Sequence, residues 1–159
     1  MNALVWAISG LGATVVLTVL LAGAQGFGLT RMNLPYLLGS IFTPDRDRAR
    51  IVGIVVHLAN GWIFSLVYFA VFAVAGRATV HLGAFVGLLH GLFVAAVGLP
   101  ALPAFHPRVA RPYAGPTTER WLEPPGFMGR NYGWSTAAVL VTAHVAFGAL
   151  LAVGASLSR

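Results

Sequence analysis

Four long runs of apolar residues dominate this 159-residue chain, and they limit what it can fold into. The runs cover residues 4–28, 51–75, 80–97 and 135–157, and none of them contains Asp, Glu, Lys or Arg. A helix of roughly 20 such residues crosses the hydrocarbon core of a bilayer, where backbone polar groups must bond one another. We therefore predict an all-α membrane protein, a single domain over residues 1–159 built as a bundle of four transmembrane helices.

The charge composition supports lipid as the solvent. Only 9% of the residues are charged, against about 25% in a typical soluble domain. The net charge of +6 comes from arginine alone, which on a membrane protein favours contact with anionic lipids over binding of nucleic acid. The chain has no cysteine, so disulfides and thiolate metal ligands are excluded.

The arginines are distributed unevenly between the connections. Residues 29–50 hold four of them and the proline-rich loop at residues 101–133 holds another four, whereas the turn after the second apolar run holds only Arg77. Positive charge accumulates in cytoplasmic loops. We therefore predict that both arginine-rich loops are cytoplasmic and both termini lie outside, in the inner (plasma) membrane of a bacterium.

Local motifs predict where individual helices begin and end. Thr43-Pro44-Asp45 is typical of a helix start, so the second long helix is expected to begin there. The third helix is expected to stop at Gly98-Leu99-Pro100, because proline cannot donate into a continuing helix. The loop that follows includes His106-Pro107-Arg108, which we interpret as solvated, with contact to a lipid phosphate as the alternative.

A short internal repeat also occurs. His57-Leu-Ala-Asn-Gly61 resembles His144-Val-Ala-Phe-Gly148, and Gly12-Ala13 resembles Gly83-Ala84. The repeat predicts two helical hairpins of the same orientation, related by an axis along the membrane normal.

Several polar residues fall inside the apolar runs, and an ionisable group there indicates a functional site. Counted from the cytoplasmic ends of the helices, His57 lies about 10 Å deep, and His90 and His144 lie about 15 Å deep. Asn60, one turn from His57, and Gln25 are expected to reach the same layer.

This histidine layer has several interpretations. His57 and His144 on facing helices can ligate haem b, with His90 as a substitute ligand, or the three can bind a transition metal such as zinc. Haem propionates would then pair with the nearby arginines Arg31, Arg50 and Arg130. The alternative is that each histidine makes a structural hydrogen bond between helices. No motif for catalysis is present at a usable spacing.

Glycines lie beside these histidines and make surfaces on which another helix can pack closely. These candidate packing residues are Gly61, Gly83, Gly87, Gly91 and Gly148.

Five short motifs resemble a family of small four-helix bacterial inner-membrane proteins of unknown function. They are Asn33-Leu-Pro-Tyr-Leu-Leu-Gly39, His57-x3-Gly61, Leu88-Leu-His-Gly91, Gly98-Leu-Pro100 and His144-x3-Gly148. The resemblance covers the four apolar runs and not the proline-rich loop. It implies a fold and a bacterial inner membrane, and it assigns no catalytic or binding residue.

From these observations we expect a polytopic membrane protein without enzymatic activity, acting as an accessory subunit of a membrane assembly. Its partners would be the lipid bilayer and another membrane protein or a second copy of the chain. A haem- or metal-binding redox protein and a small transporter or channel are the alternatives.

Overall fold

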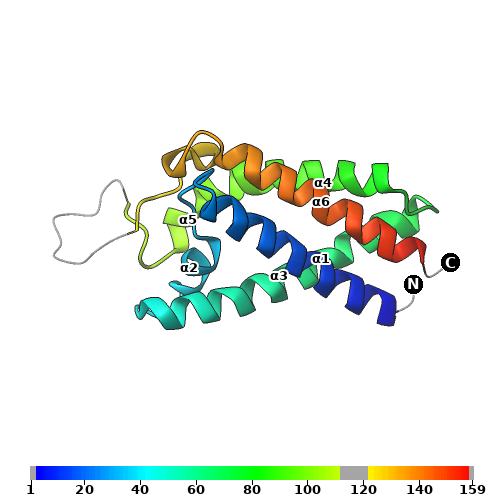
Figure 1. Ribbon diagram of the computed structural model, residues 1–159, viewed down its shortest axis with the longest axis horizontal. Coiled ribbons are helices and arrows are strands. Elements are labelled where there is room, and N and C mark those ends of the chain that lie inside the picture. Colours follow the sequence, from blue (N-terminus) through cyan, green and yellow to red (C-terminus); the bar gives the residue numbers. More distant parts are fainter. Residues whose placement is uncertain (1–2, 112–121, 158–159) are drawn as a thin grey trace.

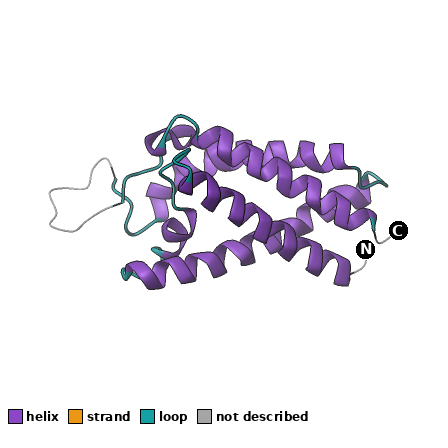
Figure 2. Cartoon of the chain, viewed as in Figure 1, coloured by secondary structure: helices purple, strands orange, loops and turns teal. Residues whose placement is uncertain are grey.

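The structure is a computed structural model, and it describes residues 3–111 and 122–157. These residues form helices and connecting loops, as Figures 1 and 2 show. The α-helices are α1 (Ala3–Gly26), α2 (Leu34–Gly39), α3 (Arg46–Val74), α4 (Val80–Phe93), α5 (Leu99–Phe105) and α6 (Thr136–Ser156). A π-helical turn, η1 (Val94–Gly98), joins α4 to α5, and a 3-10 segment, η2 (Phe127–Tyr132), precedes α6. The predicted all-helical fold is confirmed for the described part of the chain.

Four helical segments are long and apolar enough to cross a membrane. They are Ala3–Gly26, Arg46–Val74, Val80–Phe105 and Thr136–Ser156. Each contains most of one of the four predicted apolar runs. Both termini lie at the same end of the molecule as the turn at residues 75–79, and the longer loops lie at the other end (Figure 1).

The third long helix continues past the predicted stop. The boundary at residue 97 and the assignment of residues 101–105 to the proline-rich loop are therefore wrong, because α5 extends the helix to Phe105. The π-turn accommodates the interruption: its last bond runs from the Leu99 N–H to the Val94 carbonyl, which shifts the helical register. Pro100 then lies in the first turn of α5, where a backbone N–H has no partner within the helix.

The starts of α3 and α2 differ from the prediction. Asp45, and not Thr43, caps α3, because its carboxylate accepts a 2.8 Å hydrogen bond from the Arg48 N–H. The short helix α2 was not predicted at all. Asn33 caps it by accepting a 2.9 Å bond from the Tyr36 N–H.

Helix α6 packs along α4 on one side and along α1 on the other, while α1 also packs against α3. Glycine permits the closest approach, because a methyl group on Gly83 would overlap the Gly148 carbonyl and one on Gly87 would overlap the His144 carbonyl. In contrast, α3 and α4 touch each other little and diverge from the turn that joins them (Figure 1). Side chains of α3, Phe64 and Tyr68, reach His90 of α4 across the space between the two backbones.

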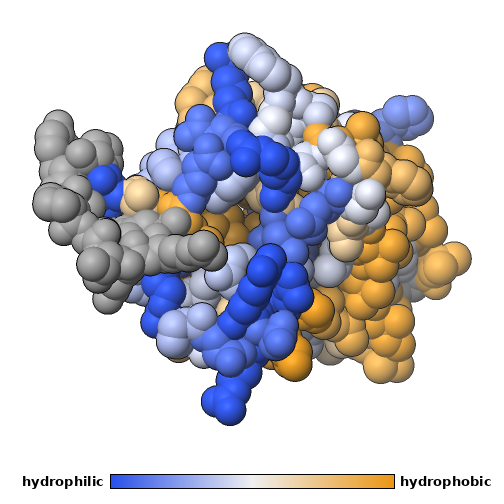
Figure 3. Space-filling view, turned by 60° about the vertical axis from the view of Figure 1, so that its left-hand side comes forward, coloured by the Kyte–Doolittle hydropathy of each residue, from blue (hydrophilic) through white to orange (hydrophobic). Residues whose placement is uncertain are grey.

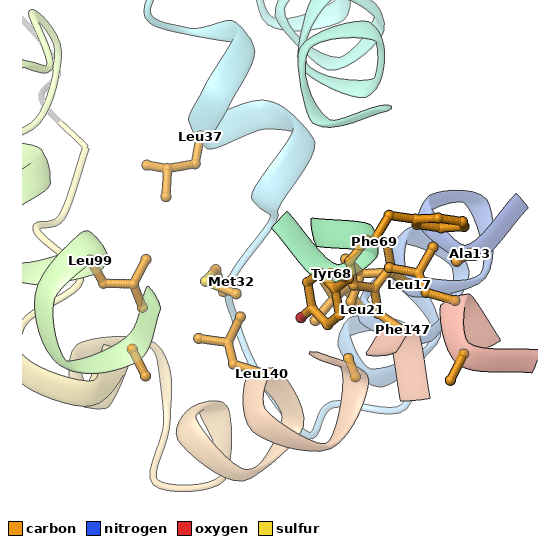
Figure 4. Close-up of a cluster of buried hydrophobic side chains, with 14 of the residues drawn as sticks. Ala13, Leu17, Leu21, Met32, Leu37, Tyr68, Phe69, Leu99, Leu140 and Phe147 are labelled. Carbon is orange, nitrogen blue, oxygen red and sulfur yellow. The ribbon is translucent and has the colours of Figure 1, made fainter. Parts of the chain in front are cut away.

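Buried apolar side chains fill the interior in two regions (Figure 4). Ala13, Leu17, Tyr68, Phe69 and Phe147 lie among the long helices. Toward the loop end, buried side chains from α2, α5 and α6 meet around the chain that precedes α2. Leu37, Leu99 and Leu140 come from these three helices, and Met32 comes from the chain before α2. Hydrophilic side chains gather on the outside of this end, as Figure 3 shows.

His106 anchors the loop end, which corrects the expectation of a solvated loop. The side chain is fully buried, and its Nε2 lies 2.9 Å from the Leu37 carbonyl. Its Nδ1 accepts a 3.0 Å bond from the Arg108 N–H, and the Arg108 guanidinium donates to the Ser40 carbonyl at 2.5 Å. Helix α2 covers His106 in this way, so the imidazole is held away from lipid phosphate.

Candidate functional site

The three histidines of the long apolar helices that were predicted to form one layer line a single pocket of about 150 Å³. His57 comes from α3, His90 from α4 and His144 from α6, so helices far apart in the sequence supply them. Asn60 also lines this pocket, whereas Gln25 does not. The remaining lining residues are Leu17, Leu34, Leu38, Gly61, Phe64, Val94, Leu140 and Phe147. We call this space the histidine pocket.

His57 is buried and forms a hydrogen bond to a side chain of α1. Its Nδ1 lies 3.0 Å from the Thr18 hydroxyl, and that hydroxyl donates its one proton to the Thr14 carbonyl at 2.7 Å. The Thr18 oxygen must therefore accept from His57, whose Nδ1 carries the proton. In the neutral imidazole, the Nε2 of His57 then has a free lone pair.

His144 has the same tautomer for a different reason. Its Nδ1 lies 2.8 Å from the Leu140 carbonyl, one turn earlier on α6. A carbonyl oxygen only accepts, so Nδ1 of His144 is the donor. The Nε2 of this neutral imidazole is again an acceptor.

His90 has the opposite tautomer. Its Nδ1 lies 3.0 Å from the hydroxyl of Tyr68, a side chain that is only 1% exposed. No other partner of this hydroxyl is found within the described residues, and a buried O–H left without an acceptor is costly. Tyr68 therefore donates to His90, and the proton of His90 is on Nε2.

The histidine pocket consequently has a defined hydrogen-bonding pattern. His57 and His144 supply one lone pair each, and His90 supplies one N–H. None of these Nε2 atoms has a hydrogen-bond partner among residues 3–111 and 122–157. The exposed amide of Asn60, which both donates and accepts, adds to the pattern from α3.

Aromatic rings form part of the pocket wall. The His90 ring lies 4.7 Å from the His144 ring, edge to face, and 4.9 Å from the Phe64 ring. Phe147 packs at a right angle to Tyr68, with 5.3 Å between the ring centroids. The imidazoles are thus fixed by ring contacts as well as by hydrogen bonds.

Two partners of the histidines were not identified from the sequence. Thr18 and Tyr68 hold His57 and His90 in place, and they lie on α1 and α3. Tyr68 follows His57 by 11 residues, which is three helical turns on the same face, so its position was detectable. Thr18 gave no such signal, because its role depends on how α1 packs against α3.

The structure limits which cofactors fit the site. Sites for drug-sized ligands have volumes of roughly 300–1,000 Å³, so a porphyrin does not fit a pocket of about 150 Å³. Within the described residues, no three side chains of His, Cys, Asp or Glu are arranged to hold a metal ion. A metal bound by all three histidines would require the imidazoles to move.

The arginines proposed for haem propionates are engaged elsewhere. Arg31 pairs with Glu123 at 3.2 Å, Arg50 pairs with Asp47 at 3.5 Å, and the Arg130 guanidinium lies over the Trp134 ring. None of the three lines the histidine pocket. Residues 112–121 of the proline-rich loop, which include one of its four arginines, Arg120, lie outside the described residues.

A second polar cluster lies at the loop end around Tyr132. The Tyr132 hydroxyl donates to the Glu123 carbonyl at 2.5 Å, and the Arg31 N–H donates to the Tyr132 carbonyl at 2.8 Å. Burial and the neighbouring Glu123 carboxylate raise the pKa of Tyr132 to about 12, against the opposing charge of Arg31. These bonds tie the chain before α2 to the chain before α6.

No protein-family model, curated protein or solved structure matches this chain. The resemblance to small bacterial inner-membrane proteins therefore stays a prediction.

Proposed function

We propose that this chain is a four-helix bundle of the bacterial inner membrane that binds a small ligand in the histidine pocket, without catalysing a reaction. The proposal rests on the hydrogen bonds of the pocket. Three imidazoles line the same pocket and are each fixed at Nδ1, and the Nε2 of each has no hydrogen-bond partner within the described residues.

The unpartnered Nε2 atoms argue against a purely structural role. Two of the Nδ1 bonds do link helices, because His57 joins α3 to α1 and His90 joins α4 to α3. One such bond per ring is enough to fix packing. His57 and His144 are buried and His90 is half-buried. A buried polar atom left unpaired costs about 1–3 kcal/mol, so the two buried Nε2 atoms favour a bound partner.

Ligand-binding histidines are likewise held in place at the ring nitrogen that does not bind the ligand. A ring held at Nδ1 presents its Nε2 in one orientation, as the second shell does for metal-bound histidines. The closely packed glycines serve a different purpose, because Gly83, Gly87 and Gly148 are used between α4 and α6 inside the chain. They therefore do not provide a surface for a partner subunit, and the pocket is the stronger guide to function.

The ligand can be sought in protein that has never left its membrane. We would excise the chain with its lipids in polymer-bounded nanodiscs and record a visible spectrum, an elemental analysis and mass spectra of the organic extract. His144→Phe fills the pocket, and His81→Phe is the matched control at an exposed position on α4. We expect a stoichiometric ligand in the parent and in the control that is lost from His144→Phe. A folded parent with the same contents as His144→Phe would contradict the proposal.

The membrane orientation has its own test. Because the chain has no cysteine, single replacements can be labelled without background. Phe42→Cys lies in an arginine-rich loop, and Val74→Cys lies at the opposite end of α3; both parent side chains are exposed. We expect a membrane-impermeant thiol reagent added to whole cells to label Val74→Cys alone, because the arginine-rich loops would face the cytoplasm. Labelling of Phe42→Cys alone would reverse the orientation.

A further inference from the structure

The geometry points to a hydroquinone ring as the ligand of the histidine pocket, carried on the lipid-soluble tail of a membrane quinol. This assignment rests on the proposed function and names the ligand class. It follows from the hydrogen-bonding pattern and the size of the pocket.

The hydrogen-bonding pattern requires a ligand with two donors. Neutral His57 and His144 supply only lone pairs at Nε2, so each needs a hydroxyl or N–H from the ligand. The two hydroxyls of a hydroquinone are such donors, and their oxygens can also accept from the Nε2–H of His90 and from the Asn60 amide. The oxidised quinone has two carbonyl oxygens and no donor, so it leaves both lone pairs unpaired.

The size of the pocket matches one six-membered ring. An apolar protein cavity of about 150 Å³ takes a single benzene molecule, and the histidine pocket has a volume of about 150 Å³. Its wall contains the rings of Phe64, His90 and Phe147, which favour a flat aromatic ligand through stacked and edge contacts. Leu17 and Leu140 complete an apolar lining for the ring edge.

The assignment places ring entry at the side of the bundle, between α3 and α4. The backbones of these helices diverge from their connecting turn, and of the pocket residues on α3, Asn60 is exposed and Phe64 is 44% exposed. Exposed apolar side chains continue along both helices, including Val67 on α3 and Leu89 and Phe93 on α4. A ring that enters by this route leaves its hydrocarbon tail in the bilayer, so the ligand need never cross water.

The test compares three probes that differ only in hydrogen-bonding groups. They are a 1,4-benzoquinol with a decyl chain, the corresponding quinone, and decylbenzene. Each is titrated calorimetrically, without oxygen, into the chain purified in mild detergent. We expect the quinol to bind at least about tenfold more tightly than the quinone, since two lost hydrogen bonds correspond to that factor or more. Decylbenzene, which has no polar group, should bind most weakly.

Variants identify the pocket as the site of binding. His144→Phe should abolish quinol binding, and Asn60→Leu should weaken it about fivefold, the effect of one hydrogen bond. Because Asn60 is exposed on α3, its replacement tests the site even if His144→Phe does not fold. His81→Phe, the matched control, should bind quinol like the parent. In a protein with ¹⁵N-labelled histidine, the Nε2 resonances of His57 and His144 should be those of unprotonated nitrogens and should shift when quinol binds.

Two results would overturn the assignment: equal binding of quinol and quinone, or quinol binding that Asn60→Leu leaves unchanged. If the nanodisc extract contains a different ligand that His144→Phe removes, the quinol assignment fails and the proposed function stands. If the parent and His144→Phe have the same contents and neither binds a probe, both fail.

Discussion

Gly87→Ala tests how closely α4 and α6 must approach to form the histidine pocket. Gly87 faces α6, and a methyl group added there would overlap the His144 carbonyl and lie 2.9 Å from the Val145 Cα. Carbon atoms in contact are normally about 3.5–4.0 Å apart, so the Val145 contact alone requires the two helices to separate by roughly 0.6 Å, and the closer His144 carbonyl requires more. The obstacle is backbone, which cannot rotate aside as a side chain does.

The expected cost follows from two opposing terms. Overpacking of this kind destabilises by about 1–3 kcal/mol, and we take the upper end because backbone atoms are in the way. Alanine is favoured over glycine within a helix by up to about 1 kcal/mol, which offsets part of the loss. Gly87→Ala should therefore lower the free energy of unfolding by about 2 kcal/mol.

Gly12→Ala is the matched control, because Gly12 is also helical but has nothing within 4 Å of the added methyl group. Only the helix propensity changes there, so this variant should gain up to about 1 kcal/mol. We would measure both by reversible unfolding in mixed micelles, following tryptophan fluorescence. If Gly87→Ala is as stable as Gly12→Ala, the close approach of α4 and α6 is not required. The position of His144 would then not be fixed by this helix contact.

Three further predictions concern the loop end. His106→Ala should destabilise by roughly 3 kcal/mol in the same unfolding assay, because it leaves a cavity, removes the acceptor of the Arg108 N–H and removes one of the two donors to the Leu37 carbonyl. Asp45→Ala should cost about 1 kcal/mol through loss of the α3 cap, with a matching loss of helicity by circular dichroism. The raised pKa of Tyr132 stabilises the fold fully below pH 10 and progressively less up to about 12. Tyr132→Phe should lose this pH dependence in unfolding measured across that range.

The long helices were predictable because their signal is local. Hydrophobicity over some 20 consecutive residues decides whether a segment suits the hydrocarbon core, whatever its neighbours are. The same reasoning failed at Pro100, where a π-turn accommodates a proline that local rules treat as a stop. It also overlooked α2, although Asn33 and Pro35 form a recognisable helix start.

The sequence predicted which histidines form the candidate site, but not which nitrogen of each ring carries the proton. The placement of His57, His90 and His144 at similar depths in apolar runs already indicated one layer, since depth depends only on position along each helix. Which ring nitrogen carries the proton depends on Thr18, Tyr68 and the Leu140 carbonyl, and thus on which helices lie side by side. The separation of the α3 and α4 backbones likewise arises because α4 follows α6. Local composition determines that this chain has four apolar helices, and only their packing determines what the histidines can bind.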